Sequence, residues 1–228
     1  MMRSGKKLLC GLTILSWGLL VASCEMDAYE KGEGELSLMT AEMADASVGS
    51  DKMVTTVTTD DGERLTLTQA ATARWMEKGD TTYRTLFYYN QMSDGRAEAV
   101  SFNKVAVLVP FTLAKDDKKD SLLTHPIYME SVWMSQNRKY INMRLRLLTG
   151  ATNDEKALHT LGIMRDTVNS TANHQRLVVY HDQGGQPEYY SSTVYASVPL
   201  NKMTADTLTI TANTYGGTFS RTFTLKKD

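Results

Sequence analysis

Cysteine is nearly absent from this chain. The sequence of 228 residues contains two, Cys10 and Cys24, and both lie near its start. The body that follows residue 24 therefore has no pair of cysteines for a disulfide, no cysteine nucleophile and no cysteine ligand for zinc. Its stability must come from a packed core, and its length is sufficient for one large domain or two small ones.

The sequence also lacks a large excess of charge of either sign. Its formal net charge is −1, and this becomes more negative if the cations Arg3, Lys6 and Lys7 are removed with a leader. Because proteins that bind nucleic acid normally carry a basic patch, we predict no nucleic-acid partner. Beyond residue 24, no apolar run approaches the roughly 20 residues that a membrane-spanning helix needs.

Familiar catalytic motifs are missing as well. The chain has no Gly-x-Ser-x-Gly nucleophile elbow, no phosphate loop and no His-Glu-x-x-His. A hydrolase site would have to be assembled from residues such as Asp166, His181, Asp182 and Glu188, but any β protein of this size contains such side chains. We therefore predict that the chain is not an enzyme and has neither catalytic residues nor a cofactor.

The histidines do not have the spacing of a metal site. His174 and His181 are seven residues apart, and an odd spacing on one strand places side chains on opposite faces. His125 precedes a proline in a predicted loop, and His159 lies in another segment. We expect isolated histidines with ordinary hydrogen bonds, and no metal.

What is present at the start is a leader. Arg3, Lys6 and Lys7 form a basic region, residues 8–20 are mainly apolar, and the sequence Val-Ala-Ser-Cys ends at Cys24. This pattern predicts a lipoprotein signal peptide over residues 1–23, with Cys24 as the lipidated first residue of the mature protein. Several acyl chains on one cysteine would hold the protein stably on a membrane. The alternative is an ordinary secretory leader followed by an incidental cysteine.

Polar and acidic residues follow the cysteine. We expect a lipidated tether over residues 24–50, with 36–38 apolar enough to begin a first strand. Glu25 and Asp27 are weak evidence for a sorting signal, so periplasmic and surface-facing orientations both stay open.

From residue 51 the pattern is strand, turn, strand. Asp60-Asp61-Gly62 separates two runs rich in Val, Thr and Leu, which predicts a hairpin, and residues 81–90 and 100–113 read as further strands. Residues 68–78 are the best helix candidate of this half. The charged run 115–120 is interpreted as a solvated linker, which divides a first domain, 51–115, from a second, 116–228.

The second half alternates more clearly. In residues 140–148, Ile141, Met143, Leu145 and Leu147 share one face, while Asn142, Arg144 and Arg146 share the other, predicting one buried and one wet face. Further strands are expected at 158–165, 175–181, 189–200, 208–213 and 218–225. Strands joined by short turns indicate an antiparallel, immunoglobulin-like β-sandwich.

The aromatic residues are interpreted mainly as packing. Trp133 is predicted to anchor the core of the second domain. The pairs Tyr88-Tyr89 and Tyr189-Tyr190 place one ring on each side of a strand. An outward ring is able to stack on a sugar or a peptide, but packing on a sheet is the commoner role.

The order of these features resembles that of the NigD-like lipoproteins of Gram-negative anaerobes. The matching features are Gly79-Asp80 before a strand, Val132-Trp133, residues 138–145, residues 159–161, His181-Asp182 and a Tyr-Gly-Gly turn at 215–217. The sequence has Ile141-Asn142 where we expect Leu-Asn, a conservative departure. The resemblance implies an OB-like barrel followed by a β-sandwich, and a location in the cell envelope. It implies no reaction and no catalytic residues.

The leading hypothesis is a lipid-anchored, non-enzymatic binding or accessory module at the outer membrane of a Gram-negative bacterium. Its partners would be the membrane, through lipid on Cys24, and a carbohydrate or protein ligand, which the OB-like fold would place on the face of its second and third strands. Two alternatives stay open: a structural subunit of an envelope or surface assembly, and an envelope enzyme with an unrecognised site.

Overall fold

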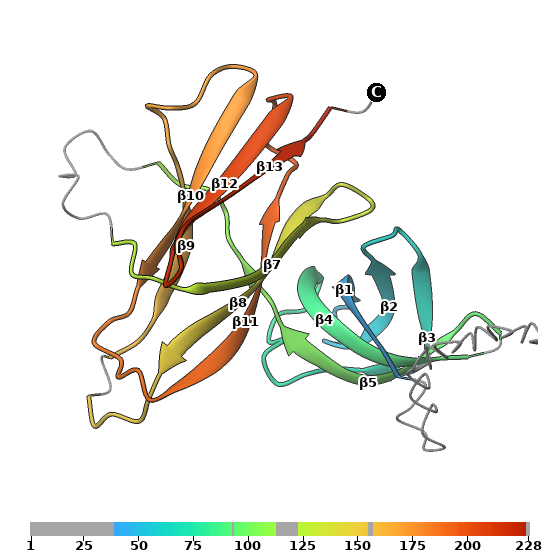
Figure 1. The fold of residues 1–228 in the computed structure, drawn as a ribbon. Helices are drawn as coiled ribbons and strands as arrows, with labels where there is room; N and C mark the ends of the chain where they lie inside the picture. The colour runs from blue at the N-terminus through green and yellow to red at the C-terminus, as the bar shows by residue number, and fades with distance from the viewer. Residues whose placement is uncertain (1–38, 93, 113–122, 155–156, 227–228) are drawn as a thin grey trace, which may run out of the picture. The chain divides into compact units, whose positions relative to one another are not determined.

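The structure is a computed structural model that describes residues 39–92, 94–112, 123–154 and 157–226. Within these residues every regular element is a strand, which confirms the mainly β fold class that the sequence predicts. Five strands form a closed barrel in the order β1-β2-β3-β5-β4, and two four-stranded sheets follow. Figure 1 shows the barrel strands in blue to green and the later sheets in yellow to red.

The barrel is built from β1 (Met39–Val48), β2 (Val54–Thr59), β3 (Arg64–Ala71), β4 (Thr81–Gln91) and β5 (Ala97–Lys104). The hairpin predicted around Asp60-Asp61-Gly62 is confirmed, and Gly62 takes a left-handed φ of 96° in its turn. Apolar side chains alternate along each strand and fill the interior, where Phe87 stacks on Tyr89 and Phe102.

The predicted tether overlaps the first barrel strand. Residues 39–48 form β1, which pairs with β4 along its whole length and with β2 over Ala44–Val48. The side chains of Ala44, Ala46 and Val48 alternate into the barrel core. Residues 39–48 are therefore a barrel strand and not part of the tether that their polar composition predicts.

The helix predicted over 68–78 is not formed. Residues up to Ala71 belong to β3, and a turn follows. Its apolar side chains still cover the barrel, because Met76 is buried and the Trp75 indole donates to the Phe102 carbonyl at 3.0 Å. The apolar spacing that resembles a helix face thus belongs to a strand end and a loop folded over the core.

The remaining strands form the sandwich. They are β6 (Ala106–Val107), β7 (Tyr128–Met134), β8 (Tyr140–Thr149), β9 (Thr160–Arg165), β10 (His174–Asp182), β11 (Tyr190–Pro199), β12 (Thr207–Thr214) and β13 (Gly217–Thr224). One sheet has the order β13-β12-β10-β9 and the other β6-β11-β8-β7. A single buried apolar cluster, which includes Ile141, Met143 and Leu208, draws side chains from both sheets.

Two pairings in the sandwich are parallel. β10 pairs with β12 because the intervening strand β11 lies in the other sheet, so the chain crosses twice before it returns. β6 pairs with β11 through Ala106 opposite Ala196 and Val107 opposite Ser197, so the chain has joined the sandwich by residue 106. The charged run 115–120 lies outside the described residues.

Candidate functional site

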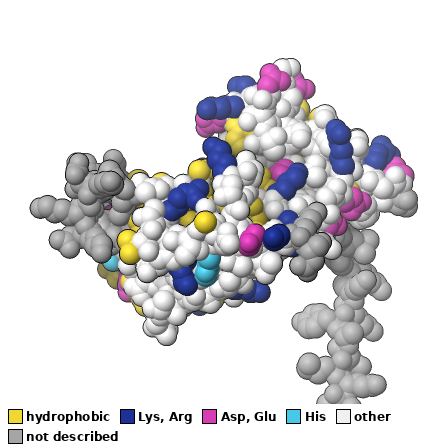
Figure 2. Space-filling model, turned by 90° about the horizontal axis from the view of Figure 1, so that it is seen from above, with side chains coloured by type: hydrophobic (Ala, Val, Ile, Leu, Met, Phe, Trp, Pro, Cys, Tyr) yellow, Lys and Arg dark blue, Asp and Glu magenta, His cyan; other side chains and the backbone are white. Residues whose placement is uncertain are grey.

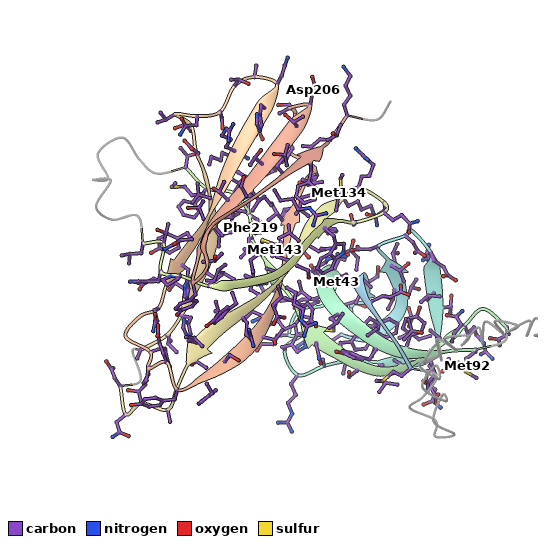
Figure 3. All side chains as sticks on the ribbon, in the orientation of Figure 1. Met43, Met92, Met134, Met143, Asp206 and Phe219 are labelled. Atoms are coloured by element: carbon purple, nitrogen blue, oxygen red, sulfur yellow. The ribbon has the colours of Figure 1, made fainter. Side chains whose placement is uncertain are left out.

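A cleft of about 600 Å³ opens between the barrel and the sandwich. One side comes from the barrel: Ala41, Glu42 and Met43 of β1, the turn after β2, and Leu86 and Tyr88 of β4. The other side comes from the sandwich strands β7, β8 and β11. Figure 3 labels Met43 and Met134, which line the barrel and sandwich sides respectively. The cleft therefore depends on both halves of the chain.

Aromatic rings form much of the cleft wall. Tyr88, Trp133 and Tyr195 line it and pack, partly buried, against a small apolar cluster of Met43, Leu86 and Val105. The prediction that Trp133 anchors the sandwich core is wrong, because Trp133 lies opposite Asn142 on the outer face of its sheet. The period-two pattern of Tyr88-Tyr89 is confirmed: Tyr89 is in the barrel core and Tyr88 points outward.

The barrel side of the cleft is acidic. Burial raises the pKa of Glu42, and the nearby carboxylates of Asp61, Glu63 and Asp60 raise it further. The Tyr89 hydroxyl donates to Glu42 at 3.3 Å, and burial raises the pKa of Tyr89 to about 12. On the sandwich side, Arg144 is held by Glu130, with 2.8 Å between Nε and the carboxylate.

A buried arginine lies beside this cleft. Arg84 of β4 donates to the carboxylates of Asp45 and Asp60, at 3.2 and 2.7 Å, and to Asn142 and Ser197 of the sandwich, at 3.0 and 3.1 Å. The side chain is almost wholly buried, so its charge is balanced by these partners rather than by water. Arg84 therefore joins barrel and sandwich through one polar network.

The partners of Arg84 are also bonded to one another. Asn142 donates to Asp60 at 2.6 Å and accepts from the Ser197 hydroxyl at 2.7 Å. The guanidinium carbon lies 4.0 Å from the centre of the Tyr140 ring. Burial raises the pKa of Tyr140 to about 12 and also raises that of Asp60, although Arg84 opposes the shift of Asp60.

Asn142 corrects a second expectation. Its strand alternates as predicted, with Ile141, Met143, Leu145 and Leu147 buried, but Asn142 is fully buried as well. The outer face of the strand is covered here because the Arg84 network of the barrel packs on it. Sequence reasoning missed Arg84 because its partners lie 24 to 113 residues away along the chain. Its one local signal is that it is the only cation in a strand of mainly apolar, aromatic and Thr side chains.

The structure brings together three histidines that the sequence predicts to be isolated. His159 Nδ1 and His181 Nε2 are 3.0 Å apart, and their rings stack with centres 5.2 Å apart. His181 Nδ1 donates to the carbonyl of His125 at 3.1 Å. The Asp182 carboxylate lies 3.6 Å from His125 Nδ1, while His174 lies apart and contacts Thr209.

The hydrogen bonds fix the protonation of the histidine pair. A carbonyl only accepts, so His181 Nδ1 carries the hydrogen and His181 Nε2 accepts from His159. Burial lowers the pKa of both rings below the ordinary 6.5. Gly184, with a φ of 61°, closes the loop beside them, because a Cβ there would lie 2.1 Å from the Leu158 carbonyl oxygen.

We expect stability to fall as the pH drops from about 7 to about 5, because the unfolded chain takes up protons on His159 and His181 that the folded protein excludes. The double variant His159→Leu/His181→Met lacks both titrating rings. Its urea midpoint, followed by circular dichroism, should change less with pH than that of the wild type. Parallel pH profiles would contradict the assignment.

The other residues named for chemistry are scattered. Asp166 holds Asn169 in a turn, and Glu188 accepts from the Tyr215 hydroxyl at 2.9 Å. Across the residues that the structure describes, no group of three or more His, Cys, Asp or Glu is arranged to hold a metal ion. Nor does any described helix have the length and apolarity to cross a membrane.

Two further expectations have different outcomes. Cys24 and the lipoprotein leader lie outside the described residues. Tyr189 and Tyr190 are 79% and 57% exposed, so neither ring is part of the sandwich core.

On the face of the molecule seen in Figure 2, cationic and acidic side chains are interspersed.

The chain is similar to several known proteins. A NigD-like C-terminal beta sandwich domain matches residues 107–225. The crystal structure of a NigD-like immunity protein from Bacteroides caccae is 27% identical, with a TM-score of 0.64 over 80% of this chain and 91% of that one.

More distant structures share the fold. A protein of unknown function from Bacteroides vulgatus is 16% identical, with a TM-score of 0.64 over 82% of this chain and 90% of that one. A putative lipoprotein from Bacteroides fragilis is 11% identical, with a TM-score of 0.56 over 83% of this chain and 99% of that one. No curated protein matches. The matching sandwich domain covers more than half of the sequence, so this chain belongs to the NigD-like family.

Proposed function

We propose that this protein is a lipid-anchored, non-enzymatic binding module of the cell envelope, and that its ligand binds in the cleft between barrel and sandwich. The observation that carries the binding function is the cleft itself: about 600 Å³, lined by three aromatic rings and by carboxylates. A concave site with aromatic walls and a few polar groups is typical of ligand recognition. It lies on β1 and β4 rather than on the β2–β3 face used by many OB folds.

A polypeptide is the favoured class of ligand. Met43, Met134, Trp133 and Tyr88 line the cleft, and methionine and aromatic side chains are enriched where proteins bind proteins. The similar protein from Bacteroides caccae is described as an immunity protein. A carbohydrate ligand is the second candidate, because the same rings would stack on a sugar.

Trp133→Ala tests the cleft. The variant is expected to bind its ligand about 30-fold more weakly or worse, because truncation of a central aromatic anchor commonly costs about 2–4 kcal/mol. The purified protein would be screened against a glycan array and a peptide library, and every hit would be titrated against the variant. Trp75→Phe, which changes a tryptophan of the barrel that does not line the cleft, is the control. Hits that bind both variants equally would place recognition outside the cleft.

Cys24→Ala tests the anchor. Cells that make the wild-type protein should incorporate labelled palmitate into it and retain it in the outer-membrane fraction, because the acyl chains on Cys24 supply the membrane affinity. The variant should lose both the label and the membrane association. Protease treatment of intact cells would then separate surface-facing from periplasmic protein. An unlabelled wild-type protein would contradict lipidation.

A further inference from the structure

The cleft is bordered by a strand edge without a partner. β1 pairs with β4 from Met39 to Val48, but β2 covers only Ala44–Val48, so among the described residues the first half of β1 has a neighbour on one side alone. Ala41 and Glu42 of this half line the cleft. An unpaired strand edge presents a row of backbone donors and acceptors to any chain that reaches it.

The direction of these backbone groups follows from one hydrogen bond. The Met43 carbonyl accepts from the Asp60 amide at 3.1 Å, so the backbone of residue 43 faces the β2 side. Because backbone groups alternate along a strand, the N–H and C=O of Ala41 face the same side, where the described chain offers no strand. Ala41 is exposed and therefore accessible to an added strand.

The sandwich supplies a second edge across the cleft. β7 is the last strand of its sheet and pairs only with β8 among the described strands. Ser131, Trp133 and Met134 of β7 line the same cleft as Ala41. A strand that entered here would lie beside β1 and beneath the aromatic wall formed by Trp133 and Tyr88.

The two faces of such a strand would meet different chemistry. Met43 and Tyr88 give one side of the cleft an apolar and aromatic surface. Glu42 lies on the opposite face of β1, close to Asp61 and Glu63. Among the described residues, none of these three carboxylates forms an ion pair with a cationic side chain. Residues directly opposite one another on neighbouring strands interact most strongly.

We infer that the cleft takes an extended polypeptide segment with alternating cationic and apolar side chains, which pairs in β conformation with the free edge of β1 at Ala41. The inference rests on the proposed binding function and specifies its ligand. Backbone hydrogen bonds to Ala41 supply affinity, the carboxylates of Glu42 and Asp61 select Lys or Arg, and Trp133 covers the apolar side chains.

The test uses a designed probe, the blocked pentapeptide Lys-Val-Lys-Val-Lys, with Glu-Val-Glu-Val-Glu as its charge-reversed partner. The wild-type protein is expected to bind the cationic peptide and not the acidic one. Two variants separate the contributions: Ala41→Pro removes the edge N–H, and Glu42→Gln removes the charge. Each should weaken binding by about tenfold or more, while the exposed Glu77→Gln, outside the cleft, should not.

Backbone pairing has its own readout. Hydrogen exchange of the Ala41 amide should slow when the cationic peptide binds the wild-type protein. Proline is tolerated where an N–H faces away from a sheet, so the Ala41→Pro variant should keep its fold, as checked by circular dichroism and urea unfolding.

The outcomes distinguish this inference from the proposed function. Strand addition is overturned if the Ala41→Pro variant still binds the peptide and if exchange of the Ala41 amide in the wild-type protein does not change on binding. The binding cleft is retained in that case if Trp133→Ala abolishes peptide binding. Binding of a glycan alone, through Trp133, likewise overturns the polypeptide ligand and keeps the cleft. Failure of every peptide and glycan to bind overturns both.

Discussion

Replacement of Arg84 by methionine is expected to lower the free energy of unfolding by about 3–5 kcal/mol, the usual cost of removing one member of a buried ion pair. Methionine keeps much of the side-chain volume, so the loss reports on charge and hydrogen bonds. Asp60 would remain buried with only Asn142 as a close partner, and Asp45 and Ser197 would lose a donor. Urea unfolding followed by circular dichroism measures the change.

The pH dependence gives this prediction a second test. Burial already raises the pKa of Asp60 while Arg84 lowers it, so removal of Arg84 raises it further. The folded variant then holds a proton that the unfolded chain releases, and such a group favours the folded state more as the pH falls. The stability deficit of Arg84→Met should therefore shrink between about pH 7 and about pH 5. A deficit that is constant with pH would contradict the role of Asp60.

Arg96 provides the matched control. Its ion pair with Asp94, at 2.6 Å, is shorter than either of the Arg84 ion pairs, but both side chains are about half exposed. Water therefore solvates the two charges when the pair is broken, and Arg96→Met should leave the urea midpoint unchanged. The contrast separates burial from distance as the source of the effect. An equal loss in both variants would show that the Arg84 network has no special role.

Phe87→Ala is expected to destabilise the protein by about 3–5 kcal/mol through loss of buried apolar surface and creation of a cavity. Phe87 is completely buried in the barrel and stacks between Tyr89 and Phe102, at centre distances of 4.8 and 5.0 Å. These rings are held by the neighbouring strands β4 and β5 of a closed barrel, so the space has little freedom to collapse. The free energy of unfolding in urea is the measurement.

The matched control for Phe87 is Phe111→Ala. Phe111 is 39% exposed and contacts the Tyr180 ring edge-on at 6.1 Å. Less apolar surface is returned to water there, so the loss should be clearly smaller than for Phe87. Phe111 also forms an isolated β-bridge with Met164 of β9. A larger loss at Phe111 would mean that the attachment of this segment to β9, rather than the barrel interior, limits stability.

Much of the fold follows from alternation along the sequence. Ile141, Met143, Leu145 and Leu147 predict a half-buried strand, and β8 has that form because each residue turns its side chain to the opposite face. The hairpin at Asp60-Asp61-Gly62 is predictable for a similarly local reason, because glycine readily adopts the positive φ that the turn needs at Gly62. These features are decided by neighbours in the chain.

The predictions that are wrong concern residues whose environment is set by contacts with distant parts of the chain. The sequence predicts a solvated Asn142, which is buried because the barrel covers the outer face of β8 there. It predicts Trp133 in the sandwich core, whereas Trp133 lines the cleft. His159 and His181 meet because β9 and β10 are neighbours in one sheet, although 22 residues separate them. No local sequence pattern predicts contacts between such distant residues. The candidate site is built almost entirely from contacts of this kind, so it could not be predicted from the sequence.

The full-length pairing of β1 with β4 has a mechanical consequence. A force applied through the chain before residue 39 pulls β1 along its own axis, while β4 holds it over ten consecutive residue pairs. Force in that direction loads the backbone hydrogen bonds together, in shear, whereas a force across the strands would open them one after another. A protein held by its N-terminal end would thus transmit tension into a strand that is paired with β4 along its full length, and the barrel would resist as one body.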